Sequence, residues 1–314
     1  MEKLLNSLEL YLDGKAVTQT EKGHFLRFIR QLKSSRRARF IYRGDSNIFE
    51  QYNIEPANLA LLAQYLFCLG NKAMYFFQKK FFERDSIFSL LWEKFHNKVC
   101  KLNFESVATK ERVSAFLQNN PIFNYYFSDE HNKDHFESLL KLPAAKAKKV
   151  ADYYLSLLHT VGKSGNGKSY FLSSSTNYLV ADIFKGDRKI IVYGWLPRKG
   201  IKDCIIECTD SVKRIQFVKS LNLPTYQTSI YPKQSEVCIK CGLLPHYIIG
   251  FQQNNKFYIN PNTLKPWNNN IVYDGLDIDQ RDFNDLSIAA KLTQSYFLYD
   301  GIYYVNYENR LEEI

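Results

Sequence analysis

The sequence predicts an α+β fold in which helices come first along the chain and a mostly antiparallel β-sheet follows. Up to about residue 158, apolar residues recur mainly at helical spacing. From residue 170 onward, short runs rich in β-branched and aromatic residues are separated by Gly, Pro, Asn and Asp. The 314 residues are 45% hydrophobic, which is enough apolar material for a packed core.

The first segment, residues 1–36, predicts two helices packed on the core. The second helix falls in EKGHFLRFIRQLKSSRR, where four apolar residues share one face at helical spacing, namely Phe25, Phe28, Ile29 and Leu32. A short strand, RFIYRG, follows at residues 39–44. The run Gly44-Asp45-Ser46-Asn47 directly after it is typical of a turn.

A long helical stretch then separates this strand from the rest of the predicted sheet. Helical spacing runs from Pro56 to about Asn97, and further helices are expected at residues 109–117, 135–142 and 144–158. We therefore predict a single domain over residues 37–314 with a helical insertion at about 56–158.

Six strands are expected in the second half of the chain. They fall at residues 170–175, 189–196, 203–209, 236–243, 247–253 and 256–261. Near the end, residues 283–301 have the pattern of a helix, and residues 301–308 predict a final strand.

The chain has a formal net charge of +10 and a pI near 9.1. Such a surface attracts polyanions, because phosphate contacts release counterions. An interpretation of equal weight is that the basic surface only keeps the protein soluble, or that it binds an acidic protein. The sequence contains no apolar run of about 18 residues, and acidic residues interrupt its first segment. We therefore expect a soluble, cytoplasmic protein with no membrane partner.

Four of the six cysteines form two short spacings, which raises the question of a zinc site. They are Cys204 and Cys208 in CIIEC, and Cys238 and Cys241 in CIKC. Both segments have the composition of strands, and residues three apart in a strand face opposite sides. Buried free cysteines are also common. No metal is expected on these grounds.

The segment GKSGNGKS, residues 162–169, fits the phosphate-loop pattern letter for letter. A phosphate loop needs a buried strand before it and a helix after it. Here the preceding segment has helical periodicity and the following one, YFLSSS, resembles a strand. We interpret the segment as an ordinary flexible loop, and a nucleoside-triphosphatase as the less favoured alternative.

Two polar motifs lie on predicted strands that are far apart in the chain. In FIYRGDSN, Arg43 ends a strand and Gly44 follows it. A guanidinium at this place can donate two parallel hydrogen bonds to a pyrophosphate. A lysine would bind the same group less specifically. In YFLSSSTNYLVADIF, an aromatic pair leads into Ser173, Ser174 and Ser175. A helix N-cap at Ser175 or Asn177 explains one serine, but not the aromatic residues before it.

A third motif, SIYPKQSEVCIKCGLLPHYIIGF, contains Gln234 and Glu236 just before or within a strand, and a Leu-Pro pair further on. Tyr231 stands three residues before Gln234. A carboxylate beside a ribose can hydrogen-bond its 2′-hydroxyl and stabilise positive charge as a glycosidic bond breaks. Gln234 is expected on the same strand face as Glu236.

Taken in this order, the motifs resemble the arginine–serine–glutamate class of ADP-ribosyltransferases over roughly residues 37–262. The first half is similar to an FRG domain, named for a Phe/Tyr-Arg-Gly strand. The resemblance implies a split-sheet ADP-ribosyltransferase core and NAD⁺ as co-substrate. Ser174 stands where the family usually has Thr, and residues 97–142 match nothing in it. His159, in LLHTVG, loosely matches a His-x-x-Gly of FRG domains and is interpreted as a structural histidine.

The resemblance also implies a role for each site residue. Glu236 would be the catalytic glutamate, and Gln234 and Tyr231 would contact the acceptor. The catalytic group is therefore expected to comprise Glu236, Gln234, Arg43 and Ser173. NAD⁺ would be held by Arg43, Gly44, Ser173, Ser174, Ser175, Tyr178 and Glu236, with Tyr178 stacked on the nicotinamide. Ala181 and Phe184 would form the packing face of the helix behind the site.

The resulting expectation is a mono-ADP-ribosyltransferase that modifies a macromolecule. A nucleic acid base in RNA or single-stranded DNA is the leading acceptor, because Gln-x-Glu accompanies a basic chain with the run SSRRARF beside Arg43. Such an enzyme resembles toxins of toxin–antitoxin or phage-defence systems, which implies an antitoxin as a further partner. A protein acceptor, through Asn, Cys or Gln, is the close alternative. A non-catalytic module that binds nucleic acid or protein is the third.

Overall fold

The computed structural model combines helices and strands in two compact units. It describes residues 1–12, 14–34, 38–45, 49, 55, 84–160, 172–185, 190–197, 205–207, 212–226, 235–239, 248–260, 296–299 and 302–305. Unit 1 comprises residues 1–71, 172–205 and 241–313, and unit 2 comprises residues 72–171, 206–240 and 314. Over the described residues the fold is α+β with a mostly antiparallel sheet, as predicted. The domain boundaries expected from the sequence stay predictions.

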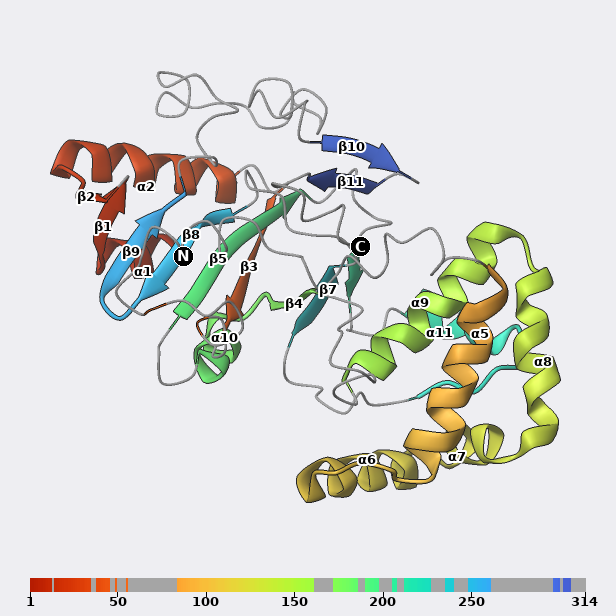
Figure 1. Cartoon of the computed structure of the whole chain (residues 1–314). Coiled ribbons are helices and arrows are strands. Elements are labelled where there is room, and N and C mark those ends of the chain that lie inside the picture. Colours follow the sequence, from red (N-terminus) through yellow and green to blue (C-terminus); the bar gives the residue numbers. More distant parts are fainter. Residues whose placement is uncertain are drawn as a thin grey trace. The chain divides into compact units, whose positions relative to one another are not determined.

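The sheet of unit 1 has the strand order β2-β1-β9-β8-β5-β3-β4 (Figure 1). Neighbouring strands are antiparallel, except that β1 and β9 run parallel. The strands are β1 (Glu9–Leu12), β2 (Lys15–Ala16), β3 (Ala38–Gly44), β4 (Leu172–Ser175), β5 (Ile190–Pro197), β8 (Ile248–Gln253) and β9 (Lys256–Ile259). A separate antiparallel pair consists of β10 (Tyr296–Tyr299) and β11 (Ile302–Val305).

Strand β3 is held on both edges, which fixes where its last residues lie. It pairs with β5 along its whole length, from Ala38 opposite Pro197 to Gly44 opposite Ile191. On its other edge Tyr42 pairs with Ser175 of β4. Because both edges are hydrogen-bonded, the end of this strand is a rigid place from which to present a side chain.

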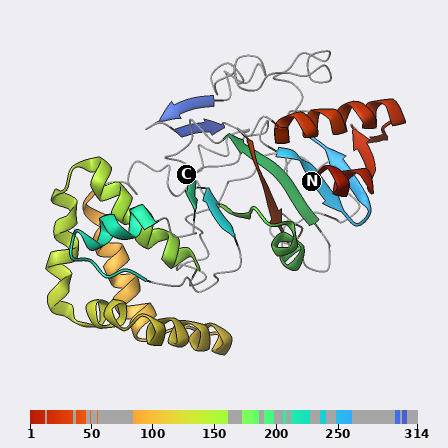
Figure 2. The same ribbon diagram turned by 180° about the vertical axis from the view of Figure 1, so that it is seen from behind.

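In the described residues of unit 1 the helices are α1 (Glu2–Asn6), α2 (Gln19–Ser34) and α10 (Tyr178–Phe184). Helix α2 opens with a reciprocal cap, since the backbone N–H of Thr18 donates to Glu21 at 2.7 Å and that of Glu21 donates to the Thr18 hydroxyl at 3.2 Å. Its predicted apolar face is buried. Phe25 of this face lies 6.2 Å from the ring of Phe257 in β9. Both ribbon views place α10 at the carboxyl end of β3 (Figures 1 and 2).

Residues 1–36 contain two helices, α1 and α2, as predicted. The first is short, and the strands β1 and β2 that follow it were not predicted. The run Leu8-Glu9-Leu10 alternates buried and exposed residues with the period of a strand. Gly14, which precedes β2, lies in the left-handed region at φ 79°, a conformation typical of a turn residue. Strand β1 pairs with β2 on one side and with β9 on the other, so it lies inside the sheet.

The prediction of a helix at residues 283–301 is wrong for its last residues. Tyr296–Tyr299 forms β10, with Tyr299 opposite Ile302 of β11. Its aromatic residues favour a strand, and Asp300-Gly301 in the sequence is a hairpin signal between two strands. The earlier part of that predicted helix lies outside the described residues.

Over its described residues, unit 2 is mainly helical and includes two short strands. Its elements are α5 (Arg84–Glu93), the π-helix η2 (Lys94–Cys100), α6 (Val107–Asn119), α7 (Pro121–Ser128), η3 (Glu130–Asn132), α8 (Lys133–Glu137), η4 (Ser138–Lys141), α9 (Ala144–Thr160), β6 (Ile205–Glu207), α11 (Val212–Lys219) and β7 (Glu236–Ile239). The helices predicted at 109–117, 135–142 and 144–158 are confirmed as α6, as α8 with η4, and as α9. Helices α7 and α11 were not predicted.

Aromatic rings form the core of unit 2 between α5, η2, α7, α8 and α9. Phe127 lies 4.8 Å from Phe95 and 4.7 Å from Phe123, measured between ring centroids. Tyr154 of α9 packs edge-on against Phe136 at 5.2 Å. Close aromatic packing of this kind favours a well-ordered helical body. Over the part of the chain that the structure describes, no helix has the length and apolar content to cross a membrane.

Candidate active site

Arg43, at the end of β3, forms the centre of the site in unit 1. Its Nη1 donates to the backbone carbonyl of Ser173 at 2.8 Å, and its Nη2 lies 3.3 Å from Asp45 Oδ2. These contacts join the first and second sequence motifs. Among the described residues, Arg43 Nε is buried with no hydrogen-bond partner. Buried donors are rarely left unpaired, so this one is a candidate for an acceptor supplied by a ligand.

Gly44 is required by the close approach of α10 to the end of β3. A Cβ atom on Gly44 would lie 2.1 Å from the carbonyl oxygen of Ala181 and 2.6 Å from the backbone nitrogen of Lys185. No side chain fits at these distances without a shift of the backbone. Ala181 is buried as the sequence predicted, whereas Phe184 is half exposed, so only the former belongs to the packing face of this helix.

The serines of β4 have separable roles. Ser174 and Ser175 are buried, while Ser173 is partly exposed. The Ser175 hydroxyl accepts from the backbone N–H of Asn177 at 3.0 Å, and Asn177 caps α10 by accepting from Leu179 N at 3.0 Å. Asn177 is thus the helix cap. Ser173 has a different role, because its backbone carbonyl accepts a hydrogen bond from Arg43.

Tyr178 lies in an aromatic cluster with Tyr42 and Tyr193, at ring-centroid distances of 5.7 and 6.2 Å. Its hydroxyl donates to Asp182 at 3.3 Å. Burial raises the pKa of all three phenols, to about 12 for Tyr42, so the cluster stays neutral at physiological pH. The ring of Tyr178 remains partly exposed, which is compatible with its predicted role beside a ligand.

Glu236 belongs to unit 2, where it begins β7. Its side chain is only 9% exposed, and its Oε1 lies 3.2 Å from Nε2 of His159, the last residue but one of α9. The preceding residue, Ser235, has φ 46°, a left-handed conformation that non-glycine residues adopt at a cost. This backbone conformation sets the direction in which Glu236 enters the strand.

Cys238 completes the same cluster. It lies two residues after Glu236 in β7, is fully buried, and belongs to the core of unit 2. The ligand-capable atoms of His159, Glu236 and Cys238 all lie within 4.8 Å of one another. The sequence singled out Glu236 but gave His159 a structural role only. The period of two between Glu236 and Cys238 was the one local signal available.

Several predicted features fall outside the described residues. These are Gln234 and Tyr231, the phosphate-loop match at 162–169, and Cys204, Cys208 and Cys241. The alternation of side chains in β7 extends back only to Glu236, where that strand begins. The segment 162–169 is preceded by helix α9 and followed by strand β4. This order is the reverse of the strand, loop and helix that a phosphate loop requires.

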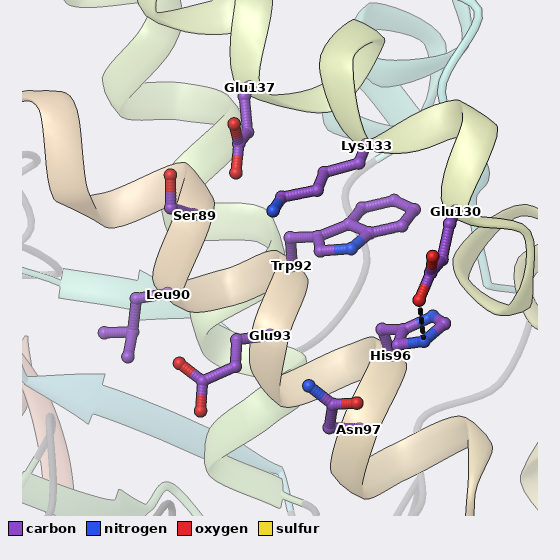
Figure 3. A pocket seen from close by; sticks show the side chains of 9 residues that line it. All are labelled: Ser89, Leu90, Trp92, Glu93, His96, Asn97, Glu130, Lys133 and Glu137. Carbon is purple, nitrogen blue, oxygen red and sulfur yellow. Dashed lines mark ion pairs between the residues drawn. The ribbon is translucent and has the colours of Figure 1, made fainter.

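Unit 2 also contains a cavity of about 530 Å³ that the sequence did not predict. Side chains of α5 and η2 form one wall and those of Glu130, Lys133 and Glu137 form the other (Figure 3). Trp92 stacks on His96 at 5.9 Å, and the Nδ1 of His96 lies 2.9 Å from the Phe127 carbonyl. A carbonyl only accepts, so this contact is a hydrogen bond in the tautomer that has its hydrogen on Nδ1. The π-helix that carries His96 is a kind of distortion frequently found at functional sites.

Comparison with known proteins neither supports nor contradicts the resemblance drawn from the motifs. No family model, curated protein or solved structure shows a significant match to this chain.

Proposed function

We propose that this chain is an NAD⁺-dependent mono-ADP-ribosyltransferase that modifies a macromolecule. The observation that supports this best is the 2.8 Å hydrogen bond from Arg43 to the Ser173 carbonyl, which brings together two motifs that lie far apart in the sequence. The finer fold assignment, a split-sheet ADP-ribosyltransferase core, is part of the same proposal. Its mostly antiparallel sheet is consistent with such a core.

Arg43 and its neighbours would hold the phosphates of NAD⁺. A guanidinium fixed at two nitrogens by Ser173 and Asp45 is oriented before the ligand arrives, which reduces the entropy lost on binding. Its buried Nε has no partner among the described residues, and a phosphate oxygen would satisfy such a donor. Gly44 lets α10 pack closely against the end of β3, next to Arg43. Tyr178 would contribute a ring face to the nicotinamide.

Glu236 would promote loss of nicotinamide. As the bond between the nicotinamide nitrogen and the ribose C1′ breaks, its electron pair leaves with nicotinamide and positive charge develops on the ribose. A buried carboxylate stabilises this charge more effectively than one in water, because the local dielectric is low. The nearby imidazole of His159 would hold the carboxylate in one orientation. The acceptor nucleophile then forms the new bond to C1′ and loses its proton.

A nucleic acid base is the acceptor that the charge of the chain favours. The net charge of +10 attracts phosphates, and Arg39 continues the basic run SSRRARF into β3. Gln234 in place of a second carboxylate disfavours an arginine acceptor, since a carboxylate would be needed to bind and deprotonate a guanidinium. Transfer to RNA or single-stranded DNA also fits a toxin of a toxin–antitoxin or phage-defence system.

The proposal is tested by incubating the purified protein with labelled NAD⁺ and, separately, with total RNA, single-stranded DNA and lysate protein. We expect label in one nucleic acid pool. Glu236→Gln should abolish it, and the matched variant Glu130→Gln, at an exposed carboxylate of the same unit, should retain it. Label in protein would move the acceptor to an Asn, Cys or Gln side chain.

If no pool is labelled and no nicotinamide is released, the result would contradict the proposed transferase and favour a binding module. Lys168→Ala provides a further arm of the test. A nucleoside-triphosphatase built on residues 162–169 would depend on this lysine far more than on Glu236.

A further inference from the structure

His159, Glu236 and Cys238 form a cluster of donor atoms whose chemistry differs from that of a simple ion pair. An imidazole nitrogen, a carboxylate oxygen and a thiol sulfur all lie within 4.8 Å of one another. Two short elements bring them together. Helix α9 supplies His159 next to its last residue, and β7 supplies Glu236 and Cys238 from alternate positions, which point to the same face of a strand.

The cluster is enclosed. The His159 side chain is 15% exposed, that of Glu236 is 9% exposed, and Cys238 is fully buried. For a carboxylate such as that of Glu236, burial is unusual unless the group is paired or binds a metal. The side chains sit between a helix end and a strand whose four residues are all buried, so their directions are set by the core. Preorganised ligands of this kind raise metal affinity.

We propose that His159, Glu236 and Cys238 bind a zinc ion. Nitrogen, oxygen and sulfur donors together suit Zn²⁺, whereas Mg²⁺ and Ca²⁺ require oxygen ligands. Zinc bonds of about 2.0–2.3 Å at tetrahedral angles separate ligand atoms by roughly 3.3–3.8 Å. The His159–Glu236 distance of 3.2 Å is already close to this range. The remaining pairs, within 4.8 Å, need a shift on the order of 1 Å at most.

Binding would leave the fourth tetrahedral position for water, as in zinc sites with three protein ligands. As the metal binds, the proton of the Cys238 thiol and any proton on the ligating imidazole nitrogen would be released to solvent, and the thiolate sulfur would bind the metal. This inference goes beyond the proposed function and does not rest on it. Because both use Glu236, zinc would occupy the carboxylate that transfer requires and would act as an inhibitor of the transferase.

The test is metal binding by the full chain, reduced and stripped with a chelator. Zn²⁺ is titrated in competition with a chromophoric chelator, and Co²⁺ serves as a spectroscopic probe of the same site. We expect one equivalent of Zn²⁺ per chain. Co²⁺ should produce a near-ultraviolet thiolate-to-metal charge-transfer band and the visible bands of tetrahedral coordination.

Variants decide which residues bind the metal. Cys238→Ser should remove the charge-transfer band. His159→Ala and Glu236→Gln should each weaken Zn²⁺ affinity at least about tenfold, because even residues that only support a ligand contribute that much. A triple variant, in which Cys204, Cys208 and Cys241 are all replaced by Ser, should retain the band. Cys100→Ser is a further control, at a thiol of unit 2 that contacts Asn124 instead.

The proposal is overturned if reduced wild-type protein gives no thiolate band, or if the band survives in Cys238→Ser and disappears in the triple variant. Circular dichroism establishes that each variant is folded. If Cys238→Ser does not fold, unchanged Zn²⁺ affinity in both His159→Ala and Glu236→Gln overturns the proposal on its own. None of these readouts involves NAD⁺, so failure of the transferase would leave the result for the metal site intact.

Discussion

The Nε2 of His159 lies 3.2 Å from the Oε1 of Glu236, so the end of a helix fixes a carboxylate at the start of a strand. Both side chains are largely removed from solvent, where a hydrogen bond between them is stronger than it would be in water. In the metal-free protein this contact orients the carboxylate for the proposed transfer.

Removing His159 should therefore lower kcat with little change in the KM for NAD⁺. We expect His159→Ala to reduce kcat by about 10²-fold, since misplacing a catalytic group by about 1 Å costs that much. His159→Gln should recover part of the loss, because its amide can still donate to Glu236. The comparison is made with a chelator present, and with His131→Ala as control, at an exposed histidine paired with Asp129. Equal kcat in all of these proteins would exclude a positioning role.

Replacing Arg43 with lysine should weaken NAD⁺ binding. An ammonium group cannot reproduce the fork that contacts both Ser173 and Asp45. Loss of a hydrogen bond to a charged group costs about 1.5–3 kcal/mol, or roughly tenfold to a hundredfold in the KM for NAD⁺. Arg30→Lys, at an exposed pair with Glu2, is the matched control and should change neither KM nor Tm. An unaltered KM in Arg43→Lys would remove this residue from the nucleotide site.

Two glycine substitutions should have opposite effects on stability. Gly44→Ala places a Cβ 2.1 Å from the carbonyl of Ala181 and should lower the free energy of unfolding by at least about 1–3 kcal/mol. Gly23→Ala lies in α2 with no atom within 4 Å of the new Cβ, and should raise it by about 0.5–1 kcal/mol. Urea denaturation of the two variants measures both. A neutral Gly44→Ala would mean that α10 can move away from β3.

Stability should fall at alkaline pH, in part through Tyr42. Burial raises the pKa of its phenol from 10.0 to about 12. Below pH 10 the folded and unfolded chains both keep the proton. Between pH 10 and 12 the unfolded chain loses it first, so stability decreases with rising pH, by about 2 kcal/mol from this group. Tyr42→Phe should make the decrease between these pH values shallower in urea denaturation, and an unchanged slope would contradict the shift.

A nucleic acid acceptor should make transfer sensitive to salt. Each phosphate contact releases a counterion, so the KM for RNA or single-stranded DNA should rise at least about tenfold between 50 and 200 mM salt. Hydrolysis of NAD⁺ without acceptor is the internal control and should change little. A KM for the acceptor that does not respond to salt would favour a protein substrate.

Much of the fold could be predicted from local patterns. The strand at Arg43 and the helix that ends near His159 both have clear periodicity, and the structure confirms them. The errors occur where turn chemistry competes with helical spacing. Asp13-Gly14 and Asp300-Gly301 are hairpin signals that an interpretation by helical period overlooks. Strand β1 also depends on a parallel partner that is distant in sequence, which no local pattern reveals.

The candidate site was predictable only in part, for a similar reason. The motifs single out Arg43, Ser173 and Glu236 because each has a characteristic neighbour, and their roles stay predictions. Arg43 donates a hydrogen bond to the backbone carbonyl of Ser173. Every residue has such a carbonyl, so the identity of Ser173 does not predict the contact. The cluster of His159 with Cys238 unites a helix end with a strand, and no spacing rule covers that combination.

The pairing of β1 with β9 also bears on how the protein can be synthesised. Residues Glu9–Tyr11 leave the ribosome well before their partners, Lys256–Tyr258. Strand β1 therefore cannot pair with β9 until that later segment has been synthesised. Unit 2 is likewise interrupted in the sequence by residues 172–205. Neither unit is a contiguous stretch that can fold as it emerges. Exposed β1 is then a hazard for aggregation during translation, and chaperones that hold nascent chains should raise the yield of active protein.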